Sequence, residues 1–135
     1  MTIKMKYSEM IVKYNALVEL ADKKLPRKAS TAMARNICKL KEEIDFYIKQ
    51  RTDIADRYAK KDANGKVVVE NGAYTFASNE YRDFFIEETE ILNNSEVEVD
   101  VITFDASELE QCDNVDRYDG LTPREEVNLS WMIKY

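Results

Sequence analysis

The chain has 135 residues, of which 44% are hydrophobic and 34% are charged, and it carries a net charge of −6 without a single histidine. This length and composition predict one globular domain, 1–135, with a single hydrophobic core and a heavily charged surface. The absence of histidine excludes Ser-His-Asp and Cys-His catalysis and removes the commonest protein ligand of transition metals.

The charge is divided unevenly along the chain. Residues 1–61 contain 15 Lys and Arg against 8 Asp and Glu, a net charge of +7, whereas residues 62–135 contain 5 against 18, a net charge of −13. Within the acidic part, the stretch 80–119 alone holds 14 acidic residues. Such asymmetry bears on partners and electrostatic fields more than on fold.

Two helices are predicted in the basic part, 1–61. Apolar residues recur every three or four positions from Ile11 to Leu25, which predicts a first helix that begins at Ser8 and ends at a corner around Pro26. A second helix is predicted over 28–61. It carries a regular heptad seam with alternating steps of four and three, made of Met33, Ile37, Leu40, Ile44, Tyr47, Arg51, Ile54 and Tyr58.

The heptad seam has two interpretations. In the first, it packs against the first helix within the same chain and forms a long helical hairpin. In the second, the seam over 33–58 forms a coiled coil with another copy of the chain, which would make the protein a homo-oligomer. Tyrosine at seam positions disfavours a tight two-stranded coil, so the sequence favours the hairpin.

A small sheet is predicted in the acidic part, 62–135. Asn71-Gly72 lies between a valine-rich run and an Ala-Tyr-Thr-Phe segment, which predicts a β-hairpin with strands at 66–70 and 73–77. Valine alternates with acidic residues over 97–101, which predicts a third strand that joins the hairpin and turns its acidic side chains outward.

Shorter helices complete the acidic part. A third helix is predicted from Ser78 or Asn79 to about Asn93, and a short one is predicted over 106–111. Thr122 and Glu125 match a capping box that opens a last helix running to about Lys134. The predicted fold class is therefore α+β: a long helical hairpin, a small antiparallel sheet of about three strands, and shorter C-terminal helices.

The acidic run 113–119 is the best candidate for a cation site. An EF-hand loop needs oxygen ligands at its first, third and fifth positions, and neither Asp113 nor Asp116 as first ligand gives that spacing. The run is therefore interpreted as a solvated loop, although a small Mg²⁺-dependent hydrolase using Asp113 or Asp116 stays as an alternative. No cofactor or catalytic residue is predicted, and Cys38 and Cys112 are expected to be free thiols.

The density of acidic side chains over 80–119 also suggests a binding surface. Such a surface could imitate the phosphate array of DNA and attract a protein whose nucleic-acid groove is basic. An alternative is that the two parts pack together and partly neutralise each other. The residues predicted to carry the binding are Glu87, Glu88, Glu96, Glu98, Asp100, Asp113, Asp116 and Asp119.

Direct binding of nucleic acid through the basic helices is a further alternative. The net charge of −6 disfavours it, because nucleic-acid-binding domains are usually basic. The basic residues that would contact phosphates surround the first corner and follow the second helix: Lys23, Lys24, Arg27, Lys28, Arg35, Lys39, Lys41 and Lys49.

No signal peptide and no membrane-spanning segment are predicted.

Several blocks of the sequence resemble a known family. They are Lys24-Leu25-Pro26, the segment YAKKDANGKVVVENG at 58–72, the segment LNNSEVEVDV at 92–101, and Leu121-Thr122-Pro123. On these blocks the chain is similar to a family of small uncharacterised proteins of phages and prophages of Gram-positive bacteria. The resemblance implies a small phage accessory protein in the host cytoplasm and carries over no catalytic residue.

These observations together predict a non-enzymatic protein that acts by binding another protein. The leading hypothesis is an inhibitor of a host defence or nucleic-acid-processing complex, with the acidic surface making the contact. The main alternative is a virion or tail-assembly protein that oligomerises through the long helix.

Overall fold

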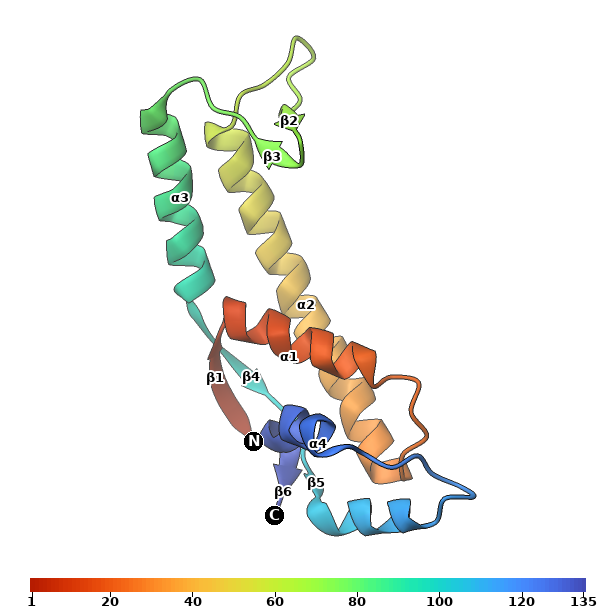
Figure 1. Cartoon of the computed structure of the whole chain (residues 1–135). Helices are drawn as coiled ribbons and strands as arrows, with labels where there is room; N and C mark the ends of the chain where they lie inside the picture. Colours follow the sequence, from red (N-terminus) through yellow and green to blue (C-terminus); the bar gives the residue numbers. More distant parts are fainter.

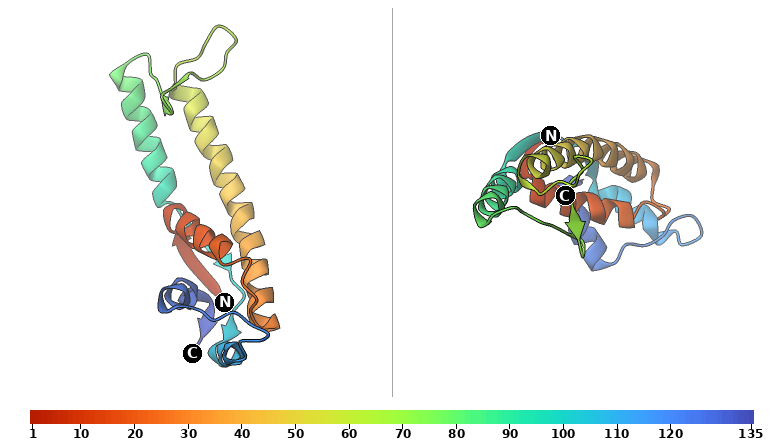
Figure 2. Two further views of the ribbon diagram at one scale, coloured as in Figure 1. Left: turned by 45° about the vertical axis from the view of Figure 1, so that its right-hand side comes forward. Right: turned by 90° about the horizontal axis from the view of Figure 1, so that it is seen from above.

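Helix α2 (Arg27–Tyr58) is the longest element of the computed structural model, which describes all 135 residues (Figure 1). Its 32 residues span roughly 48 Å, at about 1.5 Å per residue. The first half of α2 lies in a base, made of residues 1–43 and 95–135. The second half lies in an arm, made of residues 44–94, where it runs antiparallel to α3 (Asn79–Asn94). Figure 2 shows the same elongated shape from a second side.

The heptad seam of α2 is covered within the chain. Met33, Leu40, Ile44 and Tyr47 are buried, and all four belong to a core shared with α1 (Tyr7–Glu19). Farther along, α3 takes over the covering role, since the Tyr58 ring packs on the rings of Tyr81 and Phe84. The intramolecular interpretation is the one that the structure shows, with two covering helices in place of the one predicted.

Three separate two-stranded sheets replace the single sheet that was predicted. The predicted α+β class is confirmed, but the predicted pairing of the third strand with the hairpin is wrong. Strand β4 (Glu96–Asp100) pairs antiparallel with β1 (Thr2–Lys6), a strand that sequence reasoning missed. The hairpin strands β2 (Val69–Glu70) and β3 (Ala73–Tyr74) pair only with each other, at the tip of the arm.

The register of β1 and β4 explains their pairing. Ile3 lies opposite Val99 and Met5 opposite Val97, so these apolar side chains share the face that contributes to the core. On the other face, Lys4 lies opposite Glu98, and Lys6 lies opposite Glu96. Opposite charges across an antiparallel pair stabilise it modestly. Glu96 and Glu98 of β4 therefore lie opposite lysines of β1, where the sequence predicted an unpaired edge.

Local turn and cap signals are confirmed. Asn71 and Gly72 have φ of 52° and 79°, and two successive left-handed residues are what a type I′ hairpin turn requires. Ser78 accepts a hydrogen bond from the Tyr81 amide and caps the start of α3. Thr122 and Glu125 form the predicted capping box at the start of α4 (Pro123–Leu129).

Four of the predicted helices differ from the structure in extent or type, and the second, α2, ends at Tyr58 instead of residue 61. Helix α1 ends at Glu19, and residues 20–26 form the corner before α2. The predicted helix at 106–111 is a 3₁₀ helix, η1 (Ala106–Asp113). The last helix stops at Leu129, and a short 3₁₀ turn, η2 (Ser130–Met132), follows. The chain then extends as β6 (Ile133–Lys134), because it pairs in parallel with β5 (Phe104–Asp105).

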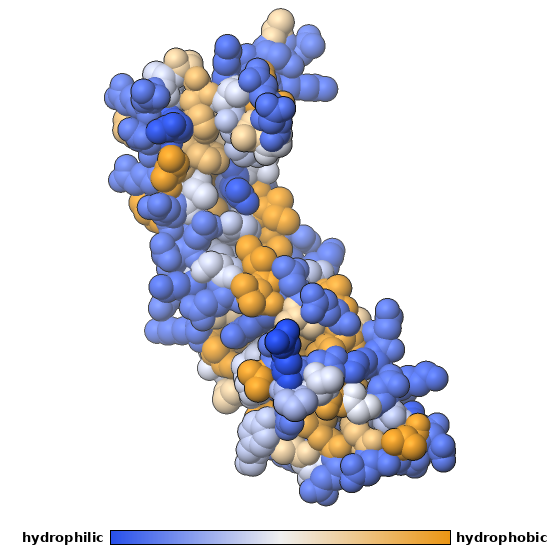
Figure 3. Space-filling view, viewed as in Figure 1, coloured by the Kyte–Doolittle hydropathy of each residue, from blue (hydrophilic) through white to orange (hydrophobic).

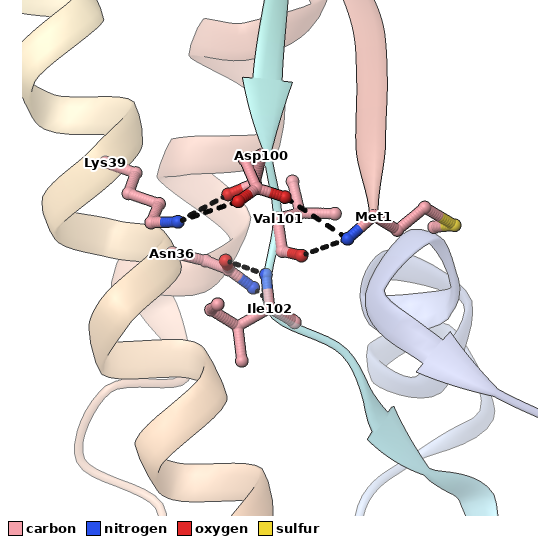
Figure 4. A network of polar contacts seen from close by, with 6 residues as sticks. All are labelled: Met1, Asn36, Lys39, Asp100, Val101 and Ile102. Carbon is pink, nitrogen blue, oxygen red and sulfur yellow. Dashed lines mark hydrogen bonds and ion pairs between the residues drawn. The ribbon is translucent and has the colours of Figure 1, made fainter.

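The hydrophobic core lies mainly in the base. It combines side chains from α1, α2, β1, β4, β5 and the C-terminal segment, whereas α3 contributes no fully buried residue. Its one buried polar residue is Asn36, whose side chain donates to the Ile102 carbonyl and accepts from the Ile102 amide, both at 2.8 Å (Figure 4). The Asn36 side chain thus binds the peptide groups of Ile102 as a neighbouring strand would.

None of the helices combines the length and the apolar character that crossing a membrane requires.

Candidate functional site

The basic and acidic parts of the chain meet through ion pairs. Six of the seven ion pairs join the Met1 amino group or a basic side chain of 1–61 to an acidic side chain of 62–135. The shortest, between Lys23 and Glu125, measures 2.6 Å and is mostly shielded from solvent. The predicted mutual neutralisation is therefore present. Ion pairs also engage four of the eight basic residues considered for nucleic-acid binding: Lys23, Lys28, Lys39 and Lys41.

Four of the eight predicted binding residues already have partners within the chain. Glu88 turns inward between the arm helices and contacts Arg57 at 3.1 Å. Glu98 lies 4.0 Å from Lys4. Asp100 lies 3.9 Å from Lys39 and also contacts the α-amino group of Met1 (Figure 4). Asp119 accepts a hydrogen bond from the Lys24 amide at 2.7 Å, which ties its loop to the corner before α2.

The other four predicted residues are exposed and unpaired, but they do not form one surface. Glu87 lies on α3 and Glu96 at the start of β4, whereas Asp113 and Asp116 lie at the end of η1 and in the loop that follows it. Figure 1 places that loop in the base, at the opposite end of the molecule from the arm tip. The four acidic side chains are thus divided among the arm, the start of β4 and a separate loop of the base.

A regular row of carboxylates follows one face of α3. It consists of Glu80, Asp83, Glu87 and Glu90, all exposed and none in an ion pair, and is called the acidic stripe below. Their spacing of three, four and three residues places successive side chains next to one another on a helix. Only Glu87 of this set was predicted. The helical period of acidic residues, rather than their density, was the signal that could have identified the other three.

Exposed apolar side chains border the acidic stripe. Ile86 is 43% exposed and lies three residues after Asp83 and four before Glu90, while Ile91 is 63% exposed and lies four residues after Glu87. Figure 3 shows the α3 side of the arm as mostly hydrophilic, with isolated hydrophobic patches among the charges. Acidic and apolar groups are thus interleaved on a surface that nothing else in the chain covers.

The inner face of the arm holds the stripe in place. Aromatic rings fill the space between α2, α3 and the hairpin, where Phe85 packs on Tyr74 and Phe76. Glu88 next to the Tyr58 hydroxyl, together with partial burial, raises the pKa of Tyr58, and Arg57 opposes this effect. Packing on this side fixes the rotation of α3, so the stripe faces away from α2.

The structure shows no geometry for a metal centre. No group of three or more Asp, Glu, Cys or His side chains is arranged so that it could hold a metal ion. Cys38 and Cys112 are free thiols. Burial, and then the negative charges of Asp113 and Asp119, raise the pKa of Cys112, which lowers its reactivity as a nucleophile because the thiolate is the reactive form.

Comparisons of the chain with models of protein families, with curated proteins and with solved structures find no match.

Proposed function

We propose that the protein acts by binding a basic surface of another protein through the acidic stripe of α3. The observation that carries this proposal is the set of four exposed, unpaired carboxylates at Glu80, Asp83, Glu87 and Glu90. Most ion pairs elsewhere use acidic residues to join the two parts of the chain, so these four carboxylates are free to meet an external partner.

The spacing of the stripe supports a partner that normally binds nucleic acid. Ten residues separate Glu80 from Glu90, about 15 Å along the helix, which is roughly one carboxylate every 5 Å. One strand of B-DNA presents a negative charge about every 3.4 Å along the helix axis. The stripe therefore offers a line of charge somewhat sparser than one DNA strand, on a rigid helical support.

The apolar borders of the stripe support a protein rather than a small ion as the partner. Protein interfaces gain much of their affinity from apolar anchors, whereas charges add steering and specificity. Ile86 and Ile91 would supply such anchors on either side of the carboxylates. In line with the family resemblance, we propose a cytoplasmic phage accessory protein whose partner is a nucleic-acid-processing or defence protein of the host.

The experiment compares two triple variants with the same change in net charge. In the stripe variant, Asp83, Glu87 and Glu90 are replaced by Lys. In the control variant, Glu110, Asp113 and Asp116, which are exposed and unpaired in the base, are replaced by Lys. Tagged full-length proteins are first used to isolate partners from a host lysate, and the affinity for the purified partner is then measured by calorimetry.

The expected result is that the stripe variant loses affinity by at least about tenfold while the control variant retains it, with stronger binding at low salt. Unchanged affinity in the stripe variant would contradict the proposal. An equal loss in both variants would show that net charge, and not this surface, determines binding. A loss in the control variant alone would assign the binding to the base loop.

A further inference from the structure

A second feature, independent of the acidic stripe, lies at the far end of the base. An open cavity of about 390 Å³ is lined by the first turns of α2, the segment that ends in β5, and β6. Figures 1 and 2 both show the start of α2 beside these two strands, at the opposite end of the molecule from the arm tip. Ligand sites of proteins have volumes of roughly 300–1,000 Å³, so this one is large enough for a small organic molecule.

The wall of the cavity is predominantly cationic. Arg27 and Lys28 come from α2 and Lys134 from β6, against the single carboxylate of Asp105, so the lining has a net charge of +2 (3 − 1). Arg27, Lys134 and Asp105 make no ion pair or side-chain hydrogen bond within the chain. Lys28 alone has an internal partner, Glu108, at 3.6 Å, and its side chain remains 78% exposed.

The floor of the cavity is apolar and two hydroxyls lie on its wall. Ala32 and Phe104 are buried beneath it, Ile102 is half buried, and Thr31 and Thr103 supply the hydroxyl groups. Cationic walls over an apolar floor suit a ligand with an anionic end and an organic body. At about 30 Å³ per water molecule, the cavity has the volume of roughly 13 waters, far more than a single phosphate group fills.

We infer that this cavity binds a small phosphomonoester of the nucleoside monophosphate class. A phosphomonoester carries a charge of about −1.5 to −2 at neutral pH, so the two unpaired cations, Arg27 and Lys134, attract it more strongly than a carboxylate with a charge of −1. Arg27 and Lys134 contact the phosphate, with Arg27 able to bind two of its oxygens at once. The body of the ligand lies on the apolar floor.

Asp105 has a specific role in this arrangement. A carboxylate would repel the phosphate, but it accepts hydrogen bonds from sugar hydroxyls, as acidic residues do in dinucleotide-binding proteins. Asp105 and Lys134 are opposite each other at the carboxyl ends of the parallel strands β5 and β6. The two residues therefore lie side by side on the cavity wall, so that Lys134 can contact the phosphate while Asp105 contacts the neighbouring sugar hydroxyls.

The test is calorimetric titration of the full-length protein with AMP, ribose 5-phosphate, adenosine and inorganic phosphate. AMP is expected to bind one molecule per chain and more tightly than either phosphate or adenosine. The double variant Arg27→Met/Lys134→Met is expected to bind AMP at least tenfold more weakly, the order of effect of losing charge-assisted hydrogen bonds. Asp105→Asn is expected to weaken AMP and ribose 5-phosphate binding without weakening phosphate binding.

The matched control is Lys49→Met/Lys60→Met, which removes two exposed and unpaired positive charges from the arm. It is expected to bind AMP as the unaltered protein does, and because all four positions are exposed, each variant should fold normally by circular dichroism. Absence of AMP binding at millimolar concentration would overturn the inference. So would equal loss in both double variants, or phosphate or adenosine binding as tightly as AMP. If ribose 5-phosphate binds more tightly than AMP, the ligand is a sugar phosphate and not a nucleotide, and the inferred ligand class is wrong.

Discussion

Replacing Asn36 should destabilise the base more than any exposed substitution, because its side chain satisfies both peptide groups of Ile102. Leaving a buried backbone group without a partner costs about 1–3 kcal/mol. Two such groups, on a residue that is only half buried, give an expected loss of about 2–4 kcal/mol for Asn36→Ala. That is a large part of the roughly 5–15 kcal/mol of free energy that typically stabilises a domain of this kind.

A pair of variants separates lost hydrogen bonds from lost packing. Asn36→Leu keeps the number and branching of the side-chain heavy atoms but cannot bond the Ile102 peptide groups, whereas Asn36→Ala removes both the side-chain bulk and the hydrogen bonds. If hydrogen bonding dominates, Asn36→Leu remains within about 1 kcal/mol of Asn36→Ala. Each free energy of unfolding is measured by urea titration monitored by circular dichroism at neutral pH. A loss below about 1 kcal/mol in both variants would refute the role assigned to Asn36, since each unsatisfied group alone should cost that much.

Two further substitutions test the base and the arm separately. The hydrogen bond from Lys23, and then that from the Thr122 amide, lower the pKa of Glu125. The ionised Glu125 carboxylate therefore stabilises the fold fully above its unfolded pKa of about 4.3, and this stabilisation is lost as the pH falls through the folded pKa. Glu125→Gln should lower the unfolding free energy at pH 7, and its difference from the unaltered protein should shrink as the pH falls below the unfolded pKa. A difference that stays constant as the pH falls would contradict this linkage. Ser78→Ala removes the cap of α3 and should lower the free energy of unfolding by about 1 kcal/mol. Hydrogen exchange of the α3 amides should become faster while the β1 amides keep their protection. Equally faster exchange in both elements would contradict an arm that opens independently of the base.

Short-range features of this fold could be predicted from the sequence because neighbouring residues determine them. The turn at Asn71-Gly72 depends on two left-handed backbone conformations, and the capping box at Thr122 depends on hydrogen bonds across three residues. Neither needs any information about the rest of the chain. The period of the α2 seam likewise identified the buried face of that helix, including Met33 and Leu40.

The partner of β4 could not be predicted in the same way. Pairing residues 97–101 with the nearby hairpin closes a shorter loop, and therefore costs less entropy, than pairing them with the N-terminal segment. The hairpin is thus the neighbour that the sequence favours. Two weak signals for β1 were nevertheless present, namely the alternation of Ile3 and Met5 with Lys4 and Lys6, and the complementary acidic residues of β4. Five-residue patterns of this kind also occur in many segments that are not strands, so only the folded chain distinguishes them.

The candidate site was predicted in type but not in extent. An acidic surface was expected, yet Glu88 and Asp100 are engaged within the chain, and Asp113 and Asp116 lie at the other end of the molecule. The helical period decides which face of its own helix a carboxylate lies on, so the sequence contained enough information to identify the whole stripe, although only Glu87 was predicted. The cationic cavity could not, because Arg27 and Lys134 come together only through the β5–β6 pairing.

The long-range contacts of the base, among them the β1–β4 pairing, also set the order in which the chain can fold during synthesis. Contacts within the arm join residues such as Arg57 and Glu88, 31 positions apart, whereas the Lys23–Glu125 contact of the base spans 102 positions. The base therefore cannot close until nearly all of the chain has left the ribosome, and contacts so distant in sequence form slowly. Until then, the part of the base core that β4, β5 and the C-terminal segment complete stays open, which favours aggregation of the nascent chain.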